Sequence, residues 1–73
     1  MKRKEEKREY YKKKLAIKEL TQEVKRLQEE MAVTLSNFSN TTEPQLLEYY
    51  TYDYKAKQIR HSYILKKLKE LYK

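Results

Sequence analysis

The sequence has 73 residues, no Cys, no Gly, one Pro and one His, and its formal net charge is +7 at pH 7. That length allows at most one domain. The absence of Cys excludes disulfides and thiolate metal sites, and a single His cannot build a zinc site alone. A chain this short buries only about 60% of its unfolded surface, so we expect it to need a partner chain for stability.

No constellation of catalytic residues stands out in the sequence. Without Gly, neither the P-loop nor the dinucleotide-binding fingerprint can occur, and H-E-x-x-H is absent. We therefore predict no enzyme, cofactor or metal, and no small-molecule ligand, because two helices are not expected to form a pocket of ligand size. His61 follows Arg60 and falls toward a polar arc, which predicts a solvated side chain; a proton-linked switch is the alternative.

The chain also lacks the segments that would direct it to a membrane. No stretch approaches 18 apolar residues, so no spanning helix is expected. The charged N-terminal run is not followed by the apolar region of a secretory signal. We therefore expect a cytoplasmic protein.

A first long helix is predicted over about residues 4–36. Its apolar side chains recur at alternating spacings of three and four, which is the heptad pattern of a helix facing a partner helix. The pattern weakens at Lys13, so the first dozen residues are expected to pack less well. The predicted a positions are Tyr10, Ile17, Val24, Met31 and Phe38, and the d positions are Lys13, Leu20, Leu27 and Thr34.

A loop is predicted over about residues 37–42, where Asn, Ser and Thr compete for backbone hydrogen bonds. Thr42 is the expected N-cap of the next helix, with Gln45 completing a capping box three residues later. Pro44 is tolerated in the first turn because its missing N–H would have no partner there. These signals predict a second helix over about residues 43–72.

The second helix has an apolar arc much wider than the stripe of an ordinary surface helix. One face resembles core and holds Tyr49, Tyr52, Ala56, Ile59 and Tyr63. Next to it fall Leu46, Tyr50, Ile64, Leu68 and Leu71, and Leu47, Tyr54, Leu65 and Tyr72 widen the arc further. The polar arc holds Thr51, Lys55, Gln58, His61, Lys66 and Lys69.

The short loop predicts an all-α fold, an antiparallel two-helix hairpin. One neighbouring helix cannot cover so wide an arc, so we expect the surplus to be buried in a helical bundle formed with a second copy, or against another protein. Base stacking on single-stranded nucleic acid is a further reading of the tyrosines. The expected interface residues are Leu46, Tyr49, Tyr50, Tyr52, Ala56, Ile59, Tyr63, Ile64 and Leu68.

Positive charge gathers toward both ends of the chain. Residues 1–14 carry a net +5 and residues 64–73 a net +3, and an antiparallel hairpin would bring these segments to one end. That end is either a solvated terminus or a site for phosphate backbones, an acidic protein or, least favoured, a membrane surface. The expected phosphate contacts are Lys2, Arg3, Lys4, Lys7, Arg8, Lys12, Lys13, Lys14, Lys66, Lys67, Lys69 and Lys73.

The second half resembles a known family. The matching residues are Glu43-Pro44-Gln45-Leu46-Leu47-Glu48-Tyr49, then Tyr52, Lys55-Ala56, Arg60, Tyr63-Ile64-Leu65 and Lys69, with Phe38 ahead of them. This pattern, over about residues 38–69, resembles the YaaL-like family of short bacterial proteins of unknown function, and it departs from the family at Lys57 and His61. The resemblance implies a bacterial, cytoplasmic helical hairpin, and it implies no catalytic residues. We expect a non-enzymatic interaction module that associates with itself, with nucleic-acid binding as the alternative.

Overall fold

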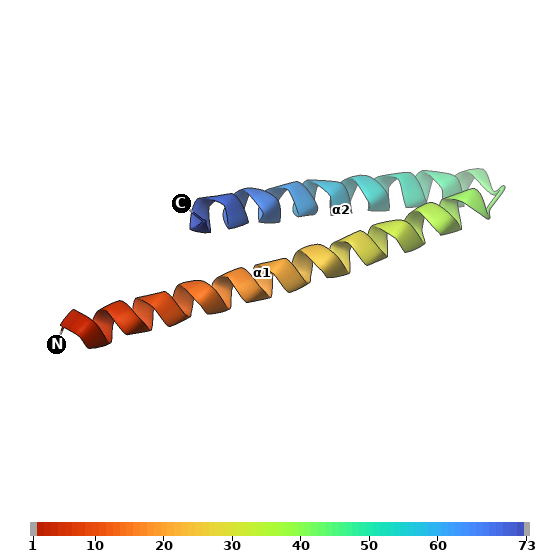
Figure 1. The fold of residues 1–73 in the computed structure, drawn as a ribbon. Coiled ribbons are helices and arrows are strands. Elements are labelled where there is room, and N and C mark those ends of the chain that lie inside the picture. The colour runs from red at the N-terminus through yellow and green to blue at the C-terminus, as the bar shows by residue number, and fades with distance from the viewer. Residues whose placement is uncertain (1, 73) are drawn as a thin grey trace.

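Two antiparallel helices make up the computed structural model, which describes residues 2–72, with side chains described for residues 4–72. Helix α1 spans Lys2–Ser39 and helix α2 spans Pro44–Leu71. The chain reverses between them, so both termini lie at the same end of the molecule (Figure 1). The predicted all-α antiparallel hairpin is confirmed, and α1 begins two residues earlier and ends three residues later than about 4–36.

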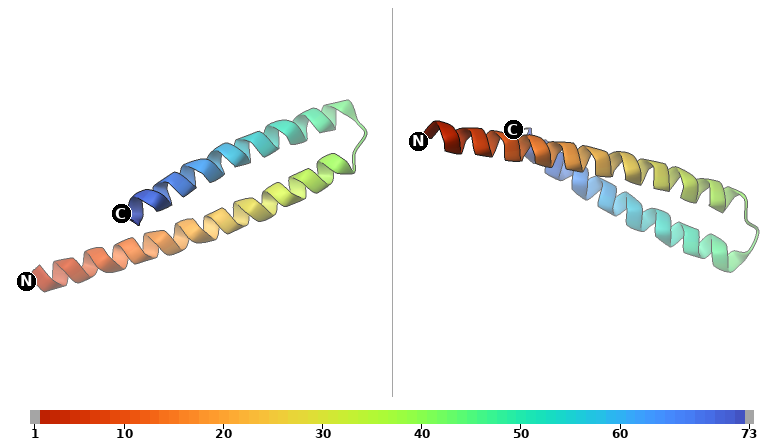
Figure 2. Two further views of the ribbon diagram at one scale, coloured as in Figure 1. Left: turned by 45° about the horizontal axis from the view of Figure 1, so that its top comes forward. Right: turned by 90° about the horizontal axis from the view of Figure 1, so that it is seen from below.

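The hairpin is a thin rod, 63 Å long and 15 by 14 Å across. The two helices lie side by side over the length of α2, inclined to one another (Figure 2). Because α1 has 38 residues and α2 has 28, the N-terminal part of α1 extends past the end of α2. We call this part of α1, residues 2–15, the overhang. No described helix is long and apolar enough to cross a membrane.

The α1 side of the seam follows the predicted heptads in its middle. Val24, Leu27 and Thr34 are buried, and Ile17 and Leu20 pack against the buried cluster. Burial of every third or fourth residue is what a stripe facing one neighbouring helix produces. The prediction is therefore confirmed from Ile17 to Thr34.

The two ends of that predicted stripe are exposed instead. Tyr10 is 61% exposed and Lys13 is exposed, because both lie in the overhang, where only Leu71 and Tyr72 at the end of α2 come near. Phe38 is 39% exposed at the opposite end, close to the chain reversal. The heptad repeat of α1 is thus longer than the segment of α1 that packs against α2.

The start of α2 differs from the predicted capping box. The N-cap is Glu43, in an extended conformation (φ −78°, ψ 122°), and no side chain caps the helix. Pro44 is the physical reason, because a proline disfavours helical backbone in the preceding residue and so fixes Glu43 as the last non-helical one. Thr41 Oγ1 accepts a hydrogen bond from the Glu43 amide at 3.4 Å. The prediction that Thr42 and Gln45 form the cap is wrong.

A regular stripe of α2 faces α1, with spacings of three and four throughout. Ile64 and Leu68 are its buried members and form one cluster with Val24 and Leu27. The other members are partly buried. One of them, Lys57, is a charged residue in the middle of the seam. We call this set the inner stripe: Leu47, Tyr50, Tyr54, Lys57, His61, Ile64, Leu68 and Leu71.

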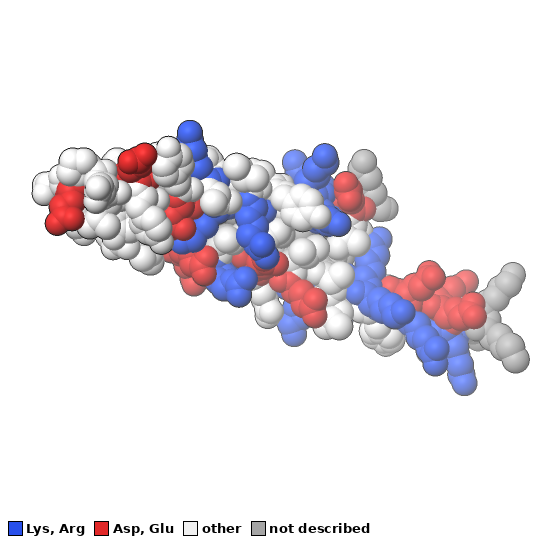
Figure 3. Space-filling view, turned by 180° about the vertical axis from the view of Figure 1, so that it is seen from behind, with Lys and Arg blue, Asp and Glu red and all other residues white. Residues whose placement is uncertain are grey.

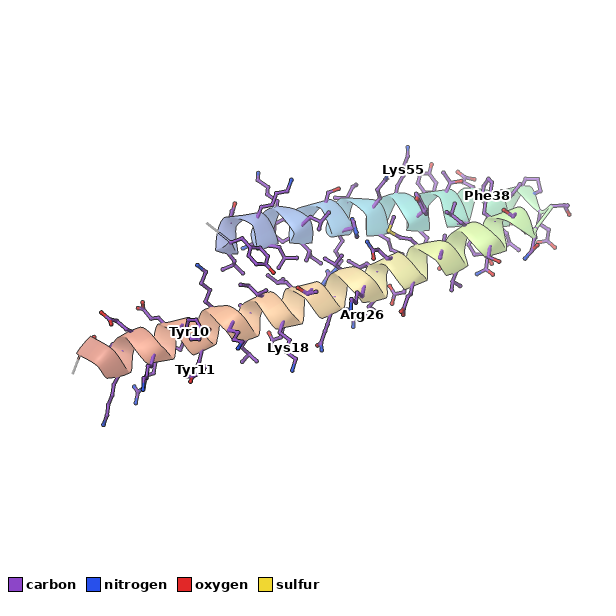
Figure 4. The ribbon with its side chains drawn as sticks, in the orientation of Figure 1. Tyr10, Tyr11, Lys18, Arg26, Phe38 and Lys55 are labelled. Carbon is purple, nitrogen blue, oxygen red and sulfur yellow. The ribbon has the colours of Figure 1, made fainter. Side chains whose placement is uncertain are left out.

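His61 belongs to this seam and not to the polar arc. It is partly buried, and its Nε2 lies 3.3 Å from Nε2 of Gln28 on α1. The side chain therefore stays partly exposed, as expected of a surface histidine, but it faces α1. The other members of the predicted polar arc are exposed, and Lys55 points away from α1 (Figure 4).

Candidate functional site: the outer face of α2

A second stripe of α2 lies on the side that α1 does not cover. Tyr49, Tyr52, Ile59 and Tyr63 are 61%, 64%, 71% and 59% exposed, and Ala56 between them is also exposed. At 100° per residue the stripe is centred about 140° away from the inner stripe. We call these five residues the outer stripe. This face, which the sequence analysis assigned to an interface with a partner, is therefore not covered within the hairpin.

The remaining predicted interface residues divide between the seam and its rim. Ile64 and Leu68 are buried against α1, with 3% and 9% exposure, so they belong to the core of the hairpin. Tyr50 is partly buried in the seam, and Leu46 is 39% exposed near the start of α2. Of the nine predicted residues, the outer stripe and Leu46 are thus available to a partner.

The outer stripe has the composition of an interface anchor and not of an ordinary solvated face. The Tyr49 ring meets Tyr50 edge to face at 5.5 Å between centroids, and Nζ of Lys67 lies 5.4 Å from the Tyr63 ring centroid. Tyrosine buries a large ring while its hydroxyl can stay wet, which suits surfaces that another molecule covers. Because the three tyrosine rings are exposed, they are also available to stack on the bases of single-stranded nucleic acid.

Polar contacts across the seam hold the two helices in register. Thr34 Oγ1 lies 3.0 Å from Asp53 Oδ2, and Nζ of Lys57 lies 2.8 Å from the same oxygen and 3.3 Å from Thr34 Oγ1. A further contact also joins α2 to α1: Nε of Arg60 donates a hydrogen bond to Oε1 of Glu23 at 2.9 Å. These pairs were not predicted from the sequence.

The Asp53–Lys57 pair perturbs both groups. The hydrogen bond from Lys57, and after it that from the Thr34 hydroxyl, lowers the pKa of Asp53 below its ordinary 3.8. The same hydrogen bond to Asp53 raises the pKa of Lys57 above 10.5. Both changes favour the charged forms, so the pair is ionised across the neutral range.

The predicted basic end is formed by the antiparallel topology. The expected contacts on α1 from Lys4 to Lys14 and on α2 from Lys66 to Lys69 are all exposed. The side chains of Lys2 and Arg3, and all of Lys73, lie outside the described residues. Figure 3 shows basic side chains gathering toward this end with carboxylates among them, whereas the loop end is mostly uncharged or acidic.

The overhang adds an exposed aromatic pair to the basic end. Tyr10 and Tyr11 are 61% and 63% exposed, with ring centroids 5.5 Å apart (Figure 4). Lys18 and Arg26, further along α1, point away from α2. This end therefore offers cations and rings together on one helix.

An open groove of about 330 Å³ runs between the helices near the loop, beside Leu35, Phe38, Tyr50 and Tyr54. Its volume reaches the lower end of the range of ligand pockets, so the expectation that two helices form no hollow of that size is wrong. Among the described side chains, no group of three or more His, Asp or Glu is close enough to hold a metal ion.

Comparisons with family models, with curated proteins and with solved structures find no match to this chain.

Proposed function

We propose that this protein is a non-enzymatic interaction module that self-associates through the outer stripe of α2. The observation that carries the proposal is the exposure of Tyr49, Tyr52, Ile59 and Tyr63 on one helical face at heptad spacing. Large aromatic side chains at the centre of a protein interface commonly supply most of the binding free energy. The YaaL-like resemblance is part of the proposal and adds a bacterial, cytoplasmic setting.

The exposed area of the single hairpin supports a partner of this kind. The chain exposes 6721 Å². A compact monomer of 9.1 kDa exposes about 4,900 Å². The surplus of about 1,800 Å² per chain exceeds the roughly 800 Å² that each partner buries in a standard protein interface.

Replacing Tyr52 by Glu tests the proposal. The change places a carboxylate on the outer stripe, and binding of the second copy would have to remove water from that charge. We therefore expect the dissociation constant to rise by at least about 100-fold, or ~2.7 kcal/mol. Sedimentation equilibrium at micromolar concentration should give a dimer for the unmodified chain and a monomer for Tyr52→Glu.

Tyr10→Glu is the matched control, because Tyr10 has a similar exposure of 61% but lies in the overhang of α1. It should leave the dimer intact. A well-folded monomer for the unmodified chain, or equal weakening by both substitutions, would contradict self-association through α2.

A second candidate function is nucleic-acid binding, which the cations and exposed Tyr10 and Tyr11 rings at the basic end favour. Binding to single-stranded DNA or RNA should weaken steeply between about 50 and 200 mM salt, because phosphate contacts release counterions. Replacing Lys12, Lys13 and Lys14 together by Gln should lower the salt slope by about two, because each phosphate contact on a single strand contributes about 0.7. A fluorescence titration measures both, and no binding at the lower salt concentration ends this candidate.

A further inference from the structure

The outer stripe spans residues 49–63, close to the middle of the helix that carries it. Helix α2 runs from residue 44 to residue 71, and its midpoint falls between Ala56 and Ile59. A two-fold axis through this point would lay α2 antiparallel on α2 of a second copy over its whole length, about 42 Å. In that register Tyr52 lies opposite Tyr63, and small Ala56 lies opposite large Ile59, as well-packed layers require.

The charges beside the outer stripe favour the same direction. In a parallel pair, a residue beside the seam faces the residue five positions later on the partner helix. Glu48 would then meet Asp53, and Lys55 would meet Arg60, so like charges would lie together. In the antiparallel register, Asp53, which also pairs with Lys57 and keeps 28% of its side chain exposed, instead lies near Arg60 of the second copy. The side chain of Arg60 is 62% exposed, so it can approach that partner from its position beside Glu23.

The charge of the whole hairpin is also divided along its length. Residues 28–58, the loop half, hold two basic and five acidic residues for a net −3, whereas the terminal half holds sixteen basic and six acidic for +10. A parallel pair places +10 beside +10. In an antiparallel pair the overhang, with a net +5, projects past the partner, and the remaining +5 of each terminal half lies beside a −3 half. Packed helices are typically 8–10 Å apart, which is within about one Debye length.

The area of the stripe is sufficient for a stable contact. With a whole aromatic side chain at roughly 200 Å², the exposed fractions of Tyr49, Tyr52, Ile59 and Tyr63 amount to about 500 Å² per chain. Two copies therefore bury about 1,000 Å² before flanking residues are counted, which is the lower bound for a specific interface.

We propose that the outer stripe binds a second copy of this chain in antiparallel orientation, with the two-fold axis between Ala56 and Ile59. The inference rests on the proposed self-association and adds its direction and register. The dimer is a rod with the two loops at opposite ends. Each basic overhang projects beyond the loop of the other copy, so the two overhangs also point in opposite directions.

Distances between spin labels on the loops test the direction. The natural sequence has no Cys, so Asn40→Cys, at the exposed chain reversal, takes a single nitroxide label. Pulsed electron paramagnetic resonance should give a distance between copies of about 40–50 Å, set by the length of α2. A parallel dimer would place the labels within about 20 Å, since packed helices are 8–10 Å apart.

The outcomes separate this inference from the proposed function. A long distance that disappears when Tyr52→Glu is added supports the antiparallel dimer through the outer stripe. A short distance in a dimer of correct mass overturns the direction and leaves self-association standing. A long distance that persists with Tyr52→Glu places the contact on another face and overturns the inference. A monomeric mass with no distance between copies overturns both proposals, and far-UV circular dichroism verifies that the labelled variants remain helical.

Discussion

Replacing Leu27 by Ala is expected to lower the free energy of unfolding by about 2–5 kcal/mol, the usual cost of such a change at a buried site. Leu27 is 3% exposed and shares one small cluster with Val24, Ile64 and Leu68. Small domains lie at the low end of the usual stability of about 5–15 kcal/mol, so the loss removes most of what holds the hairpin together. Urea unfolding followed by circular dichroism at a fixed chain concentration measures it, because self-association makes stability concentration-dependent.

Leu15→Ala is the control for Leu27→Ala, since it removes the same atoms from a side chain that is 57% exposed. Leu15 lies in the overhang, so we expect a change within about 0.5 kcal/mol. Equal losses for the two variants would show that the Val24–Leu68 cluster is not the core in solution.

The α1 half of the seam could be predicted because its pattern is unambiguous. Ile17, Leu20, Val24 and Leu27 recur on one stripe, and charged residues occupy the opposite face. A repeat of 3.5 residues points to one partner helix. How far the contact extends could not be predicted, because Tyr10 continues the repeat and only the length of α2 decides whether anything lies opposite it.

The orientation of α2 could not be predicted because this helix carries two stripes with the same spacing. By hydrophobicity alone the outer stripe, with Tyr49, Ile59 and Tyr63, looks more like core than an inner stripe interrupted by Lys57 and His61. The structure turns the more polar stripe inward because its polar residues find partners on α1. A lysine can also bury its aliphatic stem while its ammonium stays near the surface.

A signal for the correct orientation was present but lies in two distant segments. Thr34 occupies a d position of α1, and the inner stripe brings Lys57 and neighbouring Asp53 to the same level of the hairpin. Aligning the polar positions of the two stripes at equal distances from the loop would have paired Thr34 with Asp53 and Lys57. Such matching needs the loop length and the end of α1, which the sequence analysis placed three residues too early.

The same cluster is expected to fix the register of the helices more than it adds stability. Asp53→Ala leaves the Lys57 ammonium and the Thr34 hydroxyl without their carboxylate, which costs about 1–3 kcal/mol for a buried group. Since the Asp53 and Lys57 side chains are 28% and 25% exposed, we expect the lower part of that range. The double change Asp53→Leu with Lys57→Met removes both charges and should be less harmful than Asp53→Ala alone, as a double-mutant cycle of urea unfolding will show.

The pH dependence of stability gives an independent test of the Asp53–Lys57 pair. The pKa of Asp53 is lowered in the folded chain, so its contribution is complete above 3.8 and is lost as the pH falls through the folded-state value. The pKa of Lys57 is raised, so its contribution is complete below 10.5 and is lost as the pH rises through the folded-state value.

The free energy of unfolding of the unmodified chain, relative to that of Asp53→Leu/Lys57→Met, should therefore be highest between these values and fall at both extremes. Urea unfolding of the two chains near neutral pH and below pH 3.8 measures the acid side directly. The comparison cancels the titration of groups that both chains share. A difference in the free energy of unfolding that does not change with pH would mean that Asp53 and Lys57 do not pair in solution, and the register of the seam would then depend on its apolar contacts alone.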